Sequence, residues 1–275
     1  DWAIGELQEA QKKAGNSPKI NLALARFHRM KGDNVSALLA LGLRATFADT
    51  TTLFRELFHP PNRLLRALVA IYVIVPVAAV ALGLLGDLSR PVKVALLAMA
   101  VAPIPPILPG KQLKLGGEKS YVFGLLVAVS LVAIVLVPLG VDVLGRVFGR
   151  ESRFSPLEVA RLIGLTILAP LVAGLLLRQV APRLAQAAAP WASRMGNLLL
   201  VVGLVPVLIK VWPTIAALVG DGSVFAIAAL VTVAIGAGHA LGGPEADERA
   251  TLALASAMRH PGIAAAVASL NIPDE

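Results

Sequence analysis

The 275-residue sequence contains no cysteine. This absence excludes disulfide bonds, thiolate metal sites and cysteine nucleophiles. Charged residues are scarce at 15% of the chain, hydrophobic residues make up 57%, and the mean hydropathy is +0.77. This composition lies outside the range of soluble domains and is typical of membrane proteins. The net charge of +8 fits basic residues that flank membrane helices, so we expect no nucleic-acid binding.

Enzyme motifs are absent as well. The sequence has no H-E-x-x-H zinc motif, no Walker sequence and no G-x-S-x-G nucleophile motif. With four histidines and no cysteine, few ligands are available for a metal ion. We therefore expect a protein that is not an enzyme and that holds neither a metal nor an organic cofactor.

Long apolar stretches predict an all-α polytopic membrane protein. Residues 67–86, 121–141 and 222–244 contain no charged side chain apart from His239 when protonated, and each has the roughly 20 residues of a spanning helix. Five shorter segments bring the expected number of helices to eight, or nine with an atypical N-terminal one. These segments are residues 35–47, 94–109, 157–177, 196–218 and 250–272.

Basic residues suggest an orientation in the membrane. Lysine and arginine are more numerous in the loops after the first, third, fifth and seventh segments, which places these loops in the cytoplasm. We expect a multi-pass protein of the cell membrane, the inner membrane if the source is bacterial. The polar, basic residues 1–34 do not fit this orientation, because they would lie outside the cell if they ran directly into the first segment. Their stretch 20–34 fits either a helix on the membrane surface or half of a helical-repeat unit.

A weak internal repeat relates the third segment to the eighth. "ALLAMAVAP" (95–103) and "ALASAMRHP" (253–261) share the Ala-Leu opening and the proline eight residues on. Because the two segments are five apart, they cross the membrane in opposite directions, as in an inverted repeat. We expect a transporter domain over 35–275, with repeats at 35–141 and 156–275. The symmetry predicts another helix after Glu275 and one before residue 35, ten in the intact protein.

Prolines break both of these related segments. The third carries four prolines where a helix should continue, and the eighth carries Pro261 and Gly262 before a second half-helix from Ile263 to Leu270. Each proline removes a hydrogen-bond donor and clashes with the preceding turn. Broken spans are tolerated only where the freed backbone groups face protein or a water-filled cavity. Two breaks in related positions therefore predict a transport site.

The stretch "SAMRHPGIAAA" (256–266) puts Arg259 and His260 at the second break. A cation at the membrane centre costs about 2.5–3.5 kcal/mol, so Arg259 should face a polar cavity and bind an anion there. The alternative is snorkelling, or pairing with an acid such as Glu245, Asp247 or Glu248. His260 fits either a coupling proton site or a neutral side chain bonded to a freed carbonyl. The predicted substrate-binding residues are Pro103, Pro105, Pro106, Lys111, Arg259, His260 and Gly262.

Four stretches occur in a specific order and spacing: "LALGLRATFADTTTLFRELFHPP" (39–61), "AIYVIVPVAA" (70–79), "ALLAMAVAPIPP" (95–106) and "LALASAMRHPGIAAAVA" (252–268). Together they resemble the bile acid:sodium symporter family, in the wider bile-acid, arsenite and auxin-efflux superfamily. The resemblance implies a ten-helix fold with a panel domain and a core domain whose two broken helices cross. It also implies secondary transport of an organic anion coupled to sodium.

The sequence departs from this family at the positions that the resemblance assigns to sodium. Where sodium-coupled members carry polar or acidic side chains, this chain has Ile71, Leu108, Pro109, Ala255, Arg259 and His260. A hard cation needs oxygen ligands, so the departures argue against sodium coupling. They indicate that Arg259 supplies a built-in positive charge in place of the ion.

These observations predict a secondary transporter that moves a small organic anion by alternating access. Arg259 would neutralise the substrate, and His260 could couple a proton. Two alternatives stay open: sodium held by backbone carbonyls at the two breaks, or a non-transporting membrane sensor or scaffold with the same fold. Steroid-like, keto-acid and vitamin-precursor anions fit the expected apolar lining equally well.

Overall fold

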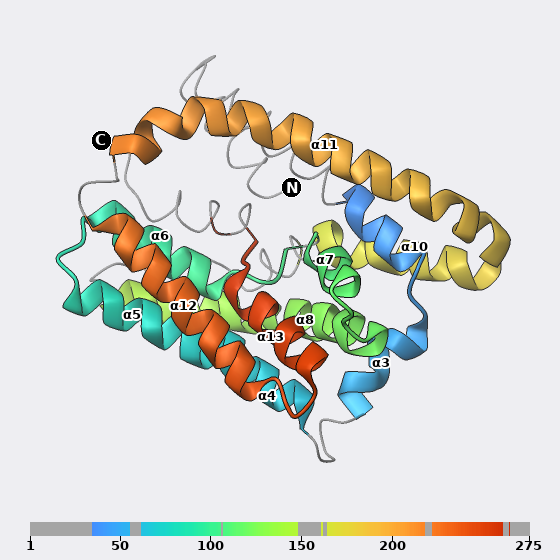
Figure 1. The fold of residues 1–275 in the computed structure, drawn as a ribbon, viewed down its shortest axis with the longest axis horizontal. Helices are drawn as coiled ribbons and strands as arrows, with labels where there is room; N and C mark the ends of the chain where they lie inside the picture. The colour runs from blue at the N-terminus through green and yellow to red at the C-terminus, as the bar shows by residue number, and fades with distance from the viewer. Residues whose placement is uncertain are drawn as a thin grey trace. The chain divides into compact units, whose positions relative to one another are not determined.

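The computed structural model describes residues 35–55, 62–105, 107–147, 161, 164–217, 222–260 and 264 (Figure 1). All regular secondary structure in these residues is helical, which confirms the predicted all-α class. Residues 35–42 are helical, and the labelled helices follow in order. They are α3 (Phe47–Arg55), α4 (Arg63–Val69), η2 (Ala70–Ile74), α5 (Val75–Leu85), α6 (Arg90–Val101), α7 (Leu108–Lys114), α8 (Lys119–Val147), η3 (Gly164–Leu168), α10 (Ala169–Val180), α11 (Pro182–Ala217), α12 (Ser223–Leu241) and α13 (Ala246–Ala257).

Among the described residues, three helical stretches are long and apolar enough to cross a bilayer. They are Arg63–Leu85, Lys119–Leu139 and Ser223–Leu241, and they match the three predicted spans to within a few residues. Val92–Val101 and Ala169–Val180 are shorter apolar helices. The segment predicted at 196–218 forms only the second part of the longer helix α11. The residues of α11 before it are rich in alanine, which favours a helix, but they are not apolar enough to have been predicted as part of a span.

Each of the two π-helical turns, η2 and η3, ends two residues before a proline, Pro76 or Pro170. In a regular α-helix the proline ring clashes with the carbonyl four residues back. Widening the turn to the π pattern moves that carbonyl away from the ring, so the helix continues past the proline. The sequence positions of these two prolines thus explain where the two π-helical turns occur.

The chain forms two units, one comprising residues 1–46 and 157–212 and the other residues 47–156 and 213–275. Each unit therefore takes residues from both of the predicted repeats. In the first unit, Gly42 and Gly174 allow two backbones to meet, because a Cβ on Gly174 would lie 2.6 Å from the Leu39 carbonyl oxygen. Arg178 Nη1 then donates a hydrogen bond of 3.0 Å to the Leu43 carbonyl.

The second unit contains both chain breaks. Its helices α12 and α13 run side by side as a hairpin (Figure 1), and Gly238 permits the close approach, since a Cβ there would lie 2.5 Å from the Ala253 Cα. A buried apolar cluster packs α5 and α6 against α12 of this hairpin and includes Val75, Leu96 and Leu230. This packing holds α6, α12 and α13 in the positions from which the site is built.

Candidate functional site

The first break follows α6. Helix α6 ends at Val101, and Ala102 adopts an extended conformation with φ −65° and ψ 145°. Residues 103–105 are not helical, and the chain becomes helical again at Leu108, where α7 begins. A residue that precedes proline is driven out of the α conformation, which accounts for the end of α6 just before Pro103. The predicted break in the third segment is confirmed.

The second break follows α13. Helix α13 ends at Ala257, Met258 is extended with φ −93° and ψ 126°, and residues 258–260 are not helical. The Ala264 N–H donates a 3.0 Å hydrogen bond to the His260 carbonyl. The predicted Pro261, Gly262 and, apart from Ala264, the second half-helix at 263–270 lie outside the described residues.

The two breaks are in direct contact. The backbone N–H of His260 donates a 2.8 Å hydrogen bond to the carbonyl of Pro103. Arg259 Nη1 donates a 3.3 Å hydrogen bond to the carbonyl of Ala102. The side chains of both Arg259 and His260 are buried, with 7% and 5% of each residue exposed. The second break is therefore fastened to the first through backbone carbonyls that the end of α6 leaves free.

Arg259 also reaches the π-helical turn η2. In that turn the Val75 N–H donates to the Ala70 carbonyl five residues back. The same pattern would pair the Ile71 carbonyl with Pro76, which has no N–H. Arg259 Nη2 donates to this carbonyl instead, at 3.0 Å. The guanidinium thus joins three segments, η2, the end of α6 and the end of α13.

The alternative in which Arg259 pairs with a nearby acid is wrong for all three acids considered. Glu248 Oε1 accepts a 2.6 Å bond from Arg63 Nη1, and the same Nη1 lies 3.2 Å from Glu118 Oε2. Glu245 and Asp247 form no ion pair with Arg259 in the part of the chain that the structure describes. Glu248 lies in the first turn of α13 and pairs with Arg63 at the start of α4, whereas Arg259 follows the other end of α13.

The structure brings together four of the seven predicted site residues: Pro103, Pro105, Arg259 and His260 are all buried in the region of the breaks. Pro106 and Gly262 lie outside the described residues. Lys111 is exposed on α7, and its neighbour Gln112 is the buried residue, with Nε2 donating a 2.8 Å bond to the Thr251 carbonyl. This bond ties α7 to α13.

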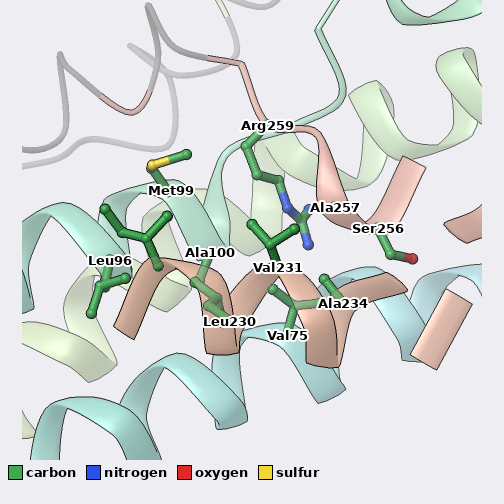
Figure 2. Close-up of a pocket in the computed structure, with 11 residues that line it drawn as sticks. Val75, Leu96, Met99, Ala100, Leu230, Val231, Ala234, Ser256, Ala257 and Arg259 are labelled. Carbon is green, nitrogen blue, oxygen red and sulfur yellow. The ribbon is translucent and has the colours of Figure 1, made fainter. Parts of the chain in front are cut away.

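An apolar hollow lies beside the guanidinium, between α5, α6, α12 and α13. Figure 2 shows Arg259 extending its guanidinium toward Val231 and beside Ala257. Two polar atoms of the lining residues, Arg259 Nε and Ser256 Oγ, are buried and have no hydrogen-bond partner among the described residues. Ser256 was not among the residues predicted from the sequence, because a serine near a helix end carries no signal of its own.

A region that begins with the helical residues 35–42 and ends in α12 matches a known family. The model of the sodium bile acid symporter family matches residues 35–233. The chain belongs to this family. Members of the sodium bile acid symporter family are multi-pass membrane transporters and not enzymes. The match includes the first break and ends before Arg259. No curated protein matches the chain.

Proposed function

We propose that this sodium bile acid symporter family protein carries a small organic anion across the cell membrane by alternating access, without sodium coupling. The observation that carries the proposal is the buried guanidinium of Arg259 at the contact between the two breaks. Its two bonded partners among the described residues are the neutral carbonyls Ala102 O and Ile71 O. The positive charge is therefore balanced by no carboxylate in the part of the chain that the structure describes.

The charge and the hydrogen-bond donors of Arg259 both favour an anion as its ligand. Arginine keeps its charge in proteins and offers five N–H donors, of which the two carbonyls take one each. A carboxylate can accept from the remaining donors, and such charge-assisted bonds are about twice as strong as neutral ones. Burying a charge without a partner costs free energy. An anion that neutralises this charge removes that cost, which adds to its binding free energy.

The carbonyls of the breaks support a mechanism without sodium. A sodium site built from backbone oxygens would need several free carbonyls at one place. At the breaks, Ile71 O and Ala102 O accept from Arg259, and Pro103 O accepts from the His260 N–H. A cation placed at these oxygens would also lie next to the fixed positive charge of Arg259.

The experiment that tests the proposal begins with ligand-induced thermal stabilisation of the purified protein by a panel of organic anions. Each anion is measured in sodium, in potassium and at two pH values. We expect anions to stabilise the protein equally in sodium and potassium. Stabilisation that requires sodium would contradict the proposal and would indicate that this protein is sodium-coupled.

The stabilising anion is then tested for uptake into sealed proteoliposomes. We expect uptake by the native protein and its loss in Arg259→Gln, which removes the charge, while Arg259→Lys keeps the charge and retains part of the anion binding. Membrane insertion and size-exclusion profiles of the variants serve as controls. Binding without uptake by the native protein would indicate a sensor, and unchanged uptake by Arg259→Gln would rule out the role given to Arg259.

A further inference from the structure

The π-helical turn η2 offers Arg259 an acceptor that a regular helix would use for itself. In η2 the Val75 N–H donates to the Ala70 carbonyl, five residues back. The next residue, Pro76, has no N–H. The Ile71 carbonyl therefore has no backbone donor at the α or the π spacing, and Arg259 Nη2 donates to it at 3.0 Å.

This hydrogen bond is sheltered from water. Ile71 is 0% exposed and Arg259 is 7% exposed, so neither group can readily exchange the bond for one to solvent. A buried polar group that loses its partner destabilises the protein, which favours this pairing over other rotamers of Arg259. Because Nη1 is bonded to the Ala102 carbonyl on a different segment, the two bonds together fix the orientation of the guanidinium plane.

Tyr72 holds the turn that carries this acceptor. Its hydroxyl donates a 2.8 Å hydrogen bond to the carbonyl of Val129, within the 29-residue helix α8. The turn is thereby tied to α8 one residue away from Ile71. The acceptor of Arg259 is thus freed by Pro76 and kept in place by Tyr72.

We propose that Pro76 is a positioning residue of the anion site, because it keeps the Ile71 carbonyl free to orient Arg259. The inference rests on the proposed function and adds to it a residue that acts through Arg259 rather than on the anion itself. A guanidinium that is already oriented binds its ligand more tightly, since no ordering cost is left for the binding step. With alanine at position 76 the turn can return to the α pattern, in which the Val75 N–H donates to the Ile71 carbonyl. Arg259 would then compete with a backbone donor and lose its fixed orientation.

The second π-helical turn supplies a matched control. Pro170 follows η3 as Pro76 follows η2, and the carbonyl five residues before Pro170 belongs to Leu165. No side chain of the described residues donates to that carbonyl. Pro170→Ala therefore removes the same kind of helix irregularity without changing an acceptor of Arg259.

A thermodynamic cycle in the protein without ligand tests the positioning directly. Arg259→Met keeps the length of the side chain without any N–H, so it leaves the Ile71 carbonyl without a donor. The change in melting temperature caused by Pro76→Ala should be at least about 3 °C more favourable in Arg259→Met than in the native protein, because only the native protein loses the Arg259 bond. Pro170→Ala should have the same effect in both backgrounds. An equal effect of Pro76→Ala in the two backgrounds would overturn the inference.

Anion affinity supplies the second test. The probes are the keto acids pyruvate and 2-oxoisovalerate, the vitamin precursor pantoate and the steroid-like acid cholate. We expect Pro76→Ala to bind the probes that the native protein binds at least tenfold more weakly, since a hydrogen bond to a charged group corresponds to about a 10- to 100-fold factor in an equilibrium constant. Pro170→Ala should leave the affinity unchanged. A lower maximal rate of uptake into proteoliposomes without a loss of affinity would indicate that Pro76 acts as a hinge, and would overturn the positioning role.

The outcomes separate the inference from the function on which it rests. Unchanged or tighter anion binding by Pro76→Ala, or an equal loss in Pro170→Ala, would overturn the positioning role and leave the anion carrier standing. If no probe binds to the native protein, or if Arg259→Gln binds the probes equally well, the proposed function fails, and the melting-temperature cycle still decides whether Pro76 orients Arg259. If Pro76→Ala does not fold, Tyr72→Phe replaces it in both tests, because loss of the hydroxyl frees η2 from α8. Unchanged affinity in Tyr72→Phe, together with no coupling to Arg259→Met, would then overturn the inference.

Discussion

The Arg63 ion pairs offer a direct test of how burial decides the strength of a charge interaction. Arg63 is paired at 2.6 Å with Glu248, whose side chain is 10% exposed, and at 3.2 Å with Glu118, whose side chain is 50% exposed. Removing one partner of a buried pair costs about 3–5 kcal/mol, whereas exposed pairs contribute about 0–1 kcal/mol. We therefore expect Glu248→Gln to cost about 3 kcal/mol, the low end, because Arg63 keeps Glu118.

The matched variant Glu118→Gln should cost less than about 1 kcal/mol. At roughly 2–4 °C per kcal/mol for a chain of this size, Glu248→Gln should lower the melting temperature by about 6 °C or more. The assay is thermal unfolding of the purified protein in one detergent at one concentration. Arg63→Gln combined with Glu248→Gln should cost less than the sum of the two single variants, since the double variant leaves no orphaned charge. Equal shifts for Glu248→Gln and Glu118→Gln would refute the reasoning.

Two further predictions follow, one from the helix packing and one from the fixed charge. Gly238→Ala should cost about 1–3 kcal/mol through overpacking against Ala253, while Gly236→Ala, whose added Cβ would have nothing within 4 Å, should be neutral or stabilising in the same melting assay. Accumulation of a monovalent anion in proteoliposomes should be about 50-fold lower at −100 mV inside than at zero potential. The potential is set by potassium diffusion. Accumulation that does not depend on the potential would show that a coupling ion compensates the charge.

The chain breaks could be predicted from the sequence because prolines act locally. The prolines after α6 end that helix whatever surrounds it, and Ala102, the residue before Pro103, leaves the α conformation. The three long spans could be predicted for a similar reason, since about 20 apolar residues suffice to cross a bilayer. The structure moves their ends by only a few residues.

The partners of Arg259 could not be predicted in the same way. The sequence suggested nearby acids, but the guanidinium bonds to carbonyls of residues 157 and 188 positions away. The bond to the Ile71 carbonyl does have a sequence signal. Pro76 lies five residues after Ile71 and has no N–H, so in a π-helical turn the Ile71 carbonyl has no backbone donor. The other bond, to the Ala102 carbonyl, depends on how the break after α13 meets the break after α6, and no local pattern carries that information. The role of Gln112, which ties α7 to α13, depends on tertiary packing for the same reason.

A positive charge that belongs to the protein has a different thermodynamic role from a positive charge that is carried across the membrane. A coupling sodium ion enters the stoichiometry of transport, so its gradient can drive accumulation of the substrate. In the proposed function, Arg259 would stabilise the bound anion but would return with the protein after each cycle, and would therefore contribute nothing to the overall driving force. A monovalent anion carried in this way would take one negative charge across per molecule, against about 2.3 kcal/mol per 100 mV of inside-negative potential, which corresponds to a roughly 50-fold effect on accumulation. A carrier of this kind favours export of its anion, unless a proton travels with the substrate.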